Sequence, residues 1–303
     1  MSAAIGGRVR VGGLDAVLLA RSARGDGRHR VVSLRLGGRD VVVKIYGRKR
    51  PRFATAMREF GHRFLVGKTG LAPSTRRDTE ARLLALWRAH GFAVPEAPPL
   101  ELPEPIAEPY LVLGRVEGPT VDARLRDPAA PAVALEAGMA RFGAEWSRRH
   151  ALAEQLGEPG LVHAHPGFTH LIDGGGAWTT FDFEYAYTDV RRVEQLVAVE
   201  IAGFVASLCR ASGARAAPLL RALVEGYTDR RRLECVVAQG AVGRFRALES
   251  LAGVAPVLRR RGPRKLRESV AALAAELERG RYAAPGAATG RLRPSAPFGS
   301  SQR

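Results

Sequence analysis

Residues 9–46 alternate apolar and polar side chains in short runs that are separated by glycine-containing turns. The runs read VRVGG, DAVLLARSA, HRVVSLRL and VVVKIY, with Gly25 to Gly27 and Gly37-Gly38 in the turns before the last two. A period of two, many β-branched residues and glycine at the turns are typical of strands joined as hairpins. This part of the chain is therefore predicted to form an antiparallel meander.

After the meander the apolar residues recur at helical spacing, and the prediction changes from strands to helices. Residues 75–90 form the clearest helix, with Ser74 or Thr75 as its expected N-cap and Gly91 at its end. A proline-rich connection then leads to a predicted strand at residues 109–113. Further helices are predicted over residues 53–64, 133–156, 189–210, 217–227 and 266–278.

This order of elements predicts an α+β fold with two lobes and a tail. Residues 1–113 are expected to form a β-rich N-terminal lobe with one important helix. Residues 114–281 are expected to form a helical C-terminal lobe with a short β-like insert, LVHAHPGFTHLI, DGGG and AWTTFDFEY. The last residues, 282–303, are rich in Pro, Gly and Ser and are expected to be disordered.

Composition adds a core of useful size and a strong positive charge. The chain has 303 residues, of which 46% are hydrophobic, and its formal net charge is +17. Such a charge usually indicates nucleic acid or an anionic surface. Here only four of the 47 basic residues are lysines, and the basic runs GRKRPR and RRRGPRKLR lack the aromatic residues that stack on bases. Direct nucleic-acid binding is therefore not favoured, and a basic RNA-binding protein is kept only as a weaker alternative.

The cysteine content and the length of the apolar stretches indicate in which cellular compartment the protein is expected. Cys209 and Cys235 are the only cysteines, so neither a disulfide framework nor a cysteine-based zinc site is expected. The longest apolar stretch, residues 196–209, is short for a bilayer and contains Glu200. No apolar signal segment precedes Arg8. We expect a cytoplasmic protein, whose Arg-rich surface would suit peripheral contact with the anionic inner face of a membrane.

Lys44 is the first residue that could carry chemistry, because it interrupts the apolar strand VVVKIYG. Its amine either reaches solvent from an edge strand or points into a phosphate site and is held by a carboxylate on a facing helix. Glu80 is the favoured carboxylate, because its helix leads through Gly91 into the next strands. Glu59 is the rival, since it is closer in sequence.

A second group of polar residues lies in the β-like insert. His163, His165 and His170 fall within eight residues, ahead of Asp182 in the sequence Phe-Asp-Phe-Glu. Asp182 either bridges a metal and a phosphate or serves as a turn or N-cap residue. Zinc binding by the histidines is a further alternative, although no fourth ligand is evident.

The order of these features resembles the protein-kinase-like superfamily. Within it, the chain looks like the bacterial branch that contains the Kdo and lipopolysaccharide-core kinases and the aminoglycoside phosphotransferases. A G-x-x-V-P turn at residues 91–95 and the sequence Phe-Asp-Phe-Glu at residues 181–184, in place of the IDFE of that branch, carry the resemblance, which covers about residues 31–210.

The resemblance implies ATP as the phosphoryl donor and Mg²⁺ or Mn²⁺ as the metal. It implies that Lys44 contacts the α- and β-phosphates, that Glu80 orients Lys44, and that Asp182 holds the metal. Residues 114–117 would be the hinge against adenine, which includes Arg115 and Glu117. The residues at the nucleotide-loop position, without the full G-x-G-x-x-G, are Gly25 and Gly27.

The catalytic loop departs from the pattern of the superfamily. His165 stands where the catalytic Asp is expected and His170 where the metal-binding Asn is expected. A histidine can accept a proton near neutral pH, so His165 and His163 are candidate catalytic residues beside Asp182. His170 as a metal ligand suits Mn²⁺ or Zn²⁺ better than Mg²⁺. Two hypotheses remain, a divergent kinase and a nucleotide-binding pseudokinase that acts as a regulatory scaffold.

The acceptor class follows from the short segment after Asp182. Asp189 and a predicted helix follow Phe-Asp-Phe-Glu within five residues, which leaves no room for a long peptide platform. The resemblance therefore implies a small-molecule, glycan or lipid-linked acceptor.

Glu200 and Lys68 also stand out in the sequence, but neither is expected to take part in catalysis. Glu200 lies on the apolar face of its helix and is expected to be buried and paired with the catalytic-loop backbone or an Arg. Lys68 ends a Walker A-like Gly-Lys-Thr, but His62 occupies the required glycine position, so a P-loop is rejected.

Overall fold

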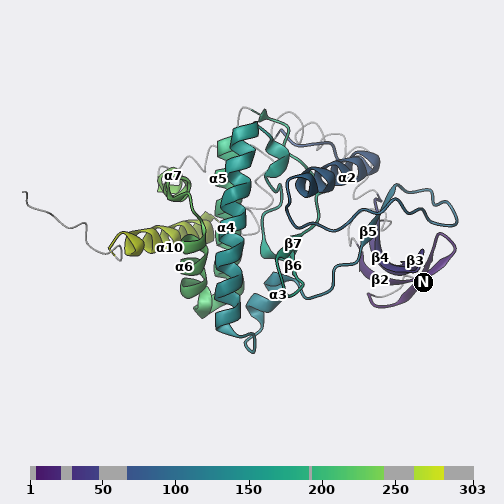
Figure 1. Ribbon diagram of the computed structural model, residues 1–303, viewed down its shortest axis with the longest axis horizontal. Coiled ribbons are helices and arrows are strands. Elements are labelled where there is room, and N and C mark those ends of the chain that lie inside the picture. The colour runs from purple at the N-terminus through teal and green to yellow at the C-terminus, as the bar shows by residue number, and fades with distance from the viewer. Residues whose placement is uncertain (1–4, 22–28, 48–66, 191–192, 242–262, 283–303) are drawn as a thin grey trace, which may run out of the picture.

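The computed structural model describes residues 5–21, 29–47, 67–190, 193–241 and 263–282. In Figure 1 a β-sheet lies at one end and most helices lie at the other, with one helix and a small hairpin between them. The predictions for Gly25, Gly27, Glu59, the helix at residues 53–64 and the tail after residue 282 lie outside the described residues.

The N-terminal lobe is a five-stranded sheet of order β1-β2-β3-β4-β5 in which all neighbours are antiparallel. The predicted meander is thus confirmed for the described residues. Gly37 and Gly38 join β3 to β4 with positive φ values of 57° and 78°, as a two-residue hairpin turn requires. The strands are β1 (Arg8–Val11), β2 (Leu14–Arg21), β3 (Arg30–Leu36), β4 (Arg39–Ile45) and β5 (Tyr110–Gly114).

The two faces of this sheet pack against different parts of the chain. Val32, Val43 and Ile45 are fully buried on one face, in a cluster that Leu102 of the connection before β5 helps to cover. Lys44 and Val42 point to the other face, because side chains alternate along a strand. Val42 packs there against the core of the helical lobe. The sheet therefore presents Lys44 toward the rest of the protein.

The rest of the chain is mainly helical, so the predicted α+β class with two lobes is confirmed. The six-residue helix α3 and the arginine-rich helix α7 were not predicted, because neither shows a clear apolar stripe over several turns. The helices are α2 (Pro73–Ala89), α3 (Val121–Arg126), α4 (Ala132–Leu156), α5 (Val193–Ser212), α6 (Ala216–Gly226), α7 (Arg230–Ala241) and α10 (Pro263–Tyr282). Shorter elements are η2 (Pro159–Leu161), η3 (Phe168–His170), η5 (Gly213–Arg215) and the hairpin β6 (Leu171–Asp173) with β7 (Trp178–Thr180).

The expected cap of α2 is wrong. Ala72 is the N-cap residue and makes no side-chain cap, while Pro73 occupies the first turn and Ser74 lies inside the helix. Proline is favoured there because its missing N–H would have no helical partner and its φ already suits the helix. The helix ends as predicted, since Gly91 follows with a φ of 71°.

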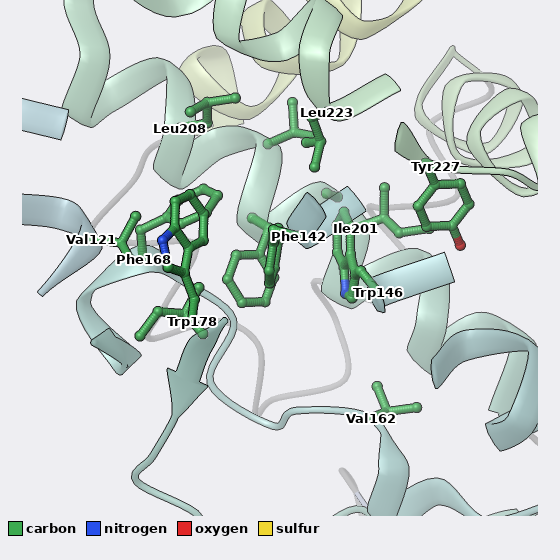
Figure 2. Close-up of a cluster of buried hydrophobic side chains, with 14 of the residues drawn as sticks. Val121, Phe142, Trp146, Val162, Phe168, Trp178, Ile201, Leu208, Leu223 and Tyr227 are labelled. Carbon is green, nitrogen blue, oxygen red and sulfur yellow. The ribbon is translucent and has the colours of Figure 1, made fainter. Parts of the chain in front are cut away.

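Aromatic side chains of α4, η3 and β7 pack together in the core of the helical lobe (Figure 2). Phe142 stacks on Trp146 with ring centroids 5.4 Å apart and meets Phe204 at 5.2 Å. Helix α6 approaches α4 so closely that a Cβ on Gly226 would lie 2.0 Å from the carbonyl oxygen of Ala140. Only glycine fits at that crossing.

Helix α5 runs with η5 and α6 as one helical stretch, Val193–Gly226, which is long and apolar enough to cross a membrane. The stretch is longer than the apolar run noted in the sequence. However, 67% of its most apolar window is buried inside the protein. Packing in the core accounts for its apolar character.

Candidate functional site

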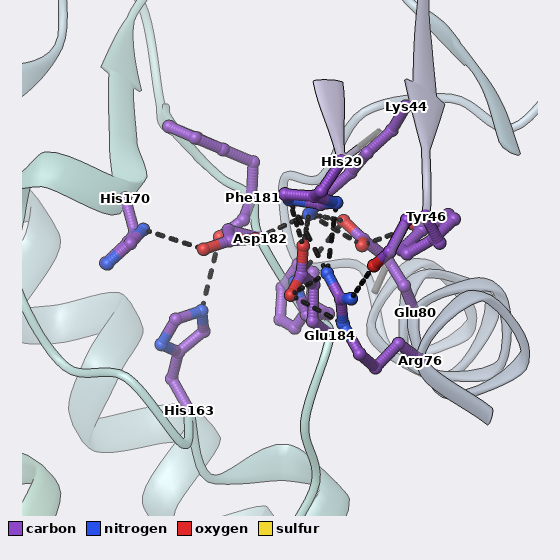
Figure 3. A network of polar contacts seen from close by, with 12 residues as sticks. His29, Lys44, Tyr46, Arg76, Glu80, His163, His170, Phe181, Asp182 and Glu184 are labelled. Atoms are coloured by element: carbon purple, nitrogen blue, oxygen red, sulfur yellow. Dashed lines mark hydrogen bonds and ion pairs between the residues drawn. The ribbon is translucent and has the colours of Figure 1, made fainter. Parts of the chain in front are cut away.

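Lys44 lies at the centre of a cluster of carboxylates between the two lobes (Figure 3). Only 6% of the residue is exposed. Its Nζ is 2.8 Å from Glu80 Oε2, 2.5 Å from Asp182 Oδ1 and 3.2 Å from Glu184 Oε1. Burial by itself lowers the pKa of Lys44, but Asp182, Glu80 and Glu184 outweigh it and hold that pKa well above its usual value. The amine is therefore charged and does not reach solvent.

Glu80 comes from the buried face of α2 and is 1% exposed. Besides Lys44, it accepts hydrogen bonds from Tyr46 Oη at 2.6 Å and from the backbone N–H of Phe183 at 3.4 Å. Burial raises the pKa of Glu80, and Lys44 opposes this shift. The structure thus places the favoured carboxylate beside Lys44, whereas the rival Glu59 lies outside the described residues.

Asp182 follows β7 with a φ of 69°, in the left-handed region that few residues other than glycine adopt. Its side chain is 27% exposed, and its Oδ2 is 3.5 Å from His170 Nδ1. Burial raises the pKa of Asp182, but Lys44 reverses the shift and holds that pKa below its usual range. Helix α5 begins only at Val193, so Asp182 is not its N-cap.

Glu184 completes the cluster, although its sequence context predicted no role for it. It is 2% exposed. Arg76 Nε and Nη2 donate to its Oε2 at 3.0 and 2.7 Å, and His29 Nε2 lies 3.1 Å from its Oε1. Arg76 is four residues before Glu80, so both lie on the same face of α2. This four-residue spacing was the signal in the sequence that Arg76 could take part in the same site as Glu80.

His163 and His165 lie on the loop between η2 and η3. His163 is 2% exposed, its Nε2 is 3.2 Å from the carbonyl oxygen of Phe181, and its Nδ1 accepts a hydrogen bond from the N–H of His165 at 3.3 Å. Burial and the nearby His170 lower the pKa of His163 to about 4, so the ring is neutral at neutral pH. Both ring nitrogens of His163 thus have partners within the protein.

His165 is half-buried, and its ring lies edge-on to Tyr185 with centroids 5.0 Å apart. Among the residues that the structure describes, none forms a hydrogen bond with its ring nitrogens. Burial, and next Lys68, lower the pKa of His165 well below its usual value. Lys68 itself is buried, donates to the carbonyl oxygen of Ala164 at 2.9 Å, and faces the Tyr187 ring at 4.6 Å.

Glu200 is buried and holds the loop between η2 and η3 in place. The predicted pairing of its carboxylate with the loop backbone or an Arg is confirmed. Its Oε2 accepts from the backbone N–H of His163 at 2.9 Å. Its carboxylate also receives Arg149 Nη2 at 2.5 Å and Trp146 Nε1 at 3.1 Å. Both alternatives, the loop backbone and an Arg, are realised together.

The expected hinge lies at the end of β5. The N–H of Gly114 donates to the carbonyl oxygen of Glu96 at 2.7 Å, and that of Arg115 to Asp40 at 3.3 Å. Arg115 Nε pairs with Glu117 Oε1 at 2.7 Å, and Arg115 Nη1 reaches Ser33 Oγ on β3 at 3.2 Å. The two side chains therefore lie at the rim of the sheet face that carries Lys44, and the first two hinge N–H groups already have partners.

The carboxylates meet a basic requirement for a hard divalent cation, which prefers oxygen ligands. One oxygen from each of Glu80, Asp182 and Glu184 lies within 4.8 Å of the others. Asp182 is the most exposed of the three, and its second oxygen faces His170. A metal ligand set of all three histidines is not offered, because both ring nitrogens of His163 have partners.

Comparisons with known proteins identify no family for this chain. No family model and no curated protein matches the chain. Twelve chains of solved structures resemble it, among them "WaaP in complex with acyl carrier protein", with a TM-score of 0.39 and 15% identity over 77% of this chain and 89% of that one. The fold is kinase-like. The structure itself shows the features of such a fold: a strand lysine paired with a helix glutamate, and a linker from the sheet into a helical lobe.

Proposed function

We propose that the chain is an ATP-dependent phosphotransferase with a hydroxyl of a small molecule, glycan or lipid-linked sugar as acceptor. One observation carries the proposal. The amine of Lys44 on β4 is held between Glu80 of α2 and Asp182 after β7, at 2.8 and 2.5 Å. A buried cation beside a partly exposed carboxylate is what binding of a metal–nucleotide complex requires.

In this proposal the residues of the cluster divide the work. Lys44 contacts the α- and β-phosphates, and Glu80 keeps its amine in place. Asp182, with His170 beside it, holds Mg²⁺ or Mn²⁺, which would offset the charge of the phosphates during transfer. Since His170 offers a nitrogen, Mn²⁺ is expected to bind at least as well as Mg²⁺.

His165 is proposed as the group that accepts the proton of the acceptor hydroxyl. Its lowered pKa keeps the ring neutral, and its ring nitrogens have no partner among the described residues. His163 is proposed to orient the loop instead, because its ring bridges Phe181 and the N–H of His165.

A small acceptor is supported by the segment that follows Asp182. Residues 186–188 pair with residues 67–69 through Thr69 N to Ala186 O at 2.9 Å and Thr188 N to Gly67 O at 2.7 Å. The segment is therefore short and already paired. The positive net charge of +17 fits an acidic glycan or a lipid-linked acceptor at the inner face of a membrane in the cytoplasm.

A nucleotide-binding pseudokinase is the second candidate, because histidines occupy the positions of the catalytic Asp and the metal-binding Asn. It predicts ATP binding without phosphoryl transfer and a scaffolding role toward a partner.

The test combines calorimetry of ATP binding, with Mg²⁺ and then Mn²⁺, and ATP turnover across a set of acceptor hydroxyls. We expect binding by the wild type that Lys44→Ala and Asp182→Ala lose, and turnover that His165→Ala loses while it still binds ATP. Binding without turnover under either metal favours the pseudokinase. A wild type that binds no ATP with either metal refutes both.

A further inference from the structure

Glu184 contacts groups from β4, from α2 and from the residue before β3, and it does so beside Lys44. Its Oε1 lies 3.2 Å from Lys44 Nζ on β4 and 3.1 Å from His29 Nε2 just before β3. Its Oε2 accepts from Arg76 of α2 at 2.7 and 3.0 Å. With 2% of its surface exposed, Glu184 is a buried junction of strand, helix and loop.

Helix α2 therefore contributes two charged groups to the cluster, one turn apart. Glu80 reaches Lys44 directly, and Arg76 reaches it through Glu184. Arg76 is 1% exposed and also donates from Nη1 to the carbonyl oxygen of Gly47 at 3.1 Å. Both turns of the helix are thus tied to the strand that carries Lys44.

The balance of buried charge gives Glu184 a role. Three carboxylates (Glu80, Asp182, Glu184) surround two permanent cations (Lys44, Arg76). The rings of His29 and His170 also contact this group, and when both rings are neutral one negative charge is in excess. A divalent cation on Asp182 takes up the excess charge. Two carboxylates then remain for two cations, and buried charges are stable when each has a partner.

We infer that Glu184 is a positioning residue, which together with Glu80 holds Lys44 against the nucleotide once Asp182 turns to the metal, and that Arg76 fixes Glu184 to α2. The inference rests on the proposed function. In the proposed function, Glu184 contacts neither the phosphates of ATP nor the acceptor. Its effect passes through Lys44 and should appear only when the metal is bound.

The experiment measures ATP affinity, by displacement of a fluorescent ATP analogue from the full chain, with Mg²⁺ and with a chelator. The variants are Glu184→Gln, Arg76→Met and the pair of both. Arg77→Met is the matched control, because Arg77 is the next residue of α2 and has a side chain 42% exposed. Among the residues that the structure describes, its guanidinium pairs only with Asp78. Thermal unfolding is recorded for each variant.

With Mg²⁺, Glu184→Gln should weaken ATP binding about tenfold, the lower end of what loss of an orienting partner costs a site. With the chelator the loss should be no more than about twofold, because Asp182 then still holds Lys44. Arg76→Met should lower Tm, and the double variant should recover Tm but keep the weakened Mg²⁺–ATP binding. If one of the single variants does not fold, the double variant still tests whether ATP binding with Mg²⁺ is weakened.

An equal loss of affinity with and without Mg²⁺ would show a merely structural role and overturn the inference, as would wild-type affinity in Glu184→Gln or in the double variant. A wild type that binds no ATP at all refutes the proposed function instead. The two failures are therefore distinguishable.

Discussion

Two buried carboxylate centres of the molecule differ in how completely they are satisfied. Glu200 is surrounded by donors of the helical lobe, including Arg149, Trp146 and the backbone of His163, and nothing of it faces solvent. The cluster at Lys44 draws its members from β4, α2 and the loop after β7, and it leaves Asp182 27% exposed. A closed, balanced centre holds a fold together, whereas an open centre with excess charge has capacity for a ligand.

The strongest test of this contrast is removal of Glu200. Glu200→Ala leaves Arg149 buried without its counter-charge, which costs about 3–5 kcal/mol when one partner of a buried ion pair is lost. Chemical denaturation of the variant should show a loss of that size. Glu194→Ala, exposed on the same helix, is the control and should change little. A loss below about 1 kcal/mol would contradict the structural role.

His150 contacts Glu200, so the pH dependence of unfolding also tests the centre around Glu200. Burial lowers the pKa of His150 to about 4 from 6.5, although Glu200 opposes the shift. The unfolded chain thus binds a proton on His150 between these values that the folded chain does not. The contribution of this one group to stability is complete above about pH 6.5, and about 3 kcal/mol of it is lost toward pH 4. Denaturation of the wild type and His150→Gln between pH 4.5 and 7.5 should give a shallower slope for the variant. Equal slopes would refute the assignment.

At the cluster around Lys44, removal of a carboxylate charge should affect ligand binding and not stability. Asp182→Asn removes the excess negative charge, and Asn tolerates the left-handed backbone at φ 69°. We expect the unfolding free energy to change by less than about 1 kcal/mol, while metal-dependent ATP binding in calorimetry is lost. Destabilisation as large as that of Glu200→Ala would place Asp182 among the structural groups.

The smallest effect is expected at the start of α2, the helix that supplies Arg76 and Glu80. Ala72 is an N-cap residue without a side-chain cap. Ala72→Ser supplies an acceptor for the first N–H groups and should raise the unfolding free energy by about 0.5–1 kcal/mol. ATP affinity should stay unchanged, since the cap lies one turn before Arg76. A changed affinity would mean that α2 is not held firmly by its two charged contacts.

Much of the fold could be predicted from local patterns. The strands around residues 9–46 showed a period of two, and the helices over residues 133–156 and 217–227 showed apolar stripes several turns long, so each burial pattern was visible in its own segment. Helices α3 and α7 escaped, because one is short and the other is arginine-rich. The N-cap of α3, Thr120, can be read from the sequence, but a single cap does not predict a helix without an apolar stripe beside it.

The candidate site could be predicted in part. Lys44, Glu80 and Asp182 stand in contexts that a sequence makes conspicuous, a lysine in an apolar strand and an acid between two phenylalanines. Arg76 and Glu184 stand in ordinary contexts, and their pairing joins positions 108 residues apart. Long-range ion pairs of this kind are invisible until the segments meet.

By itself, the sequence determined most of the strands and the longer apolar helices, because hydrophobic period and turn residues act over a few neighbouring positions. It also supplied the residue types of a metal–nucleotide site. The tertiary structure decided how each charge is used: Glu200 closed off by its own lobe, His163 engaged at both nitrogens, and Lys44 shared among three carboxylates with one left open. Burial and charge pairing depend on distances through space, and only the folded chain sets those distances.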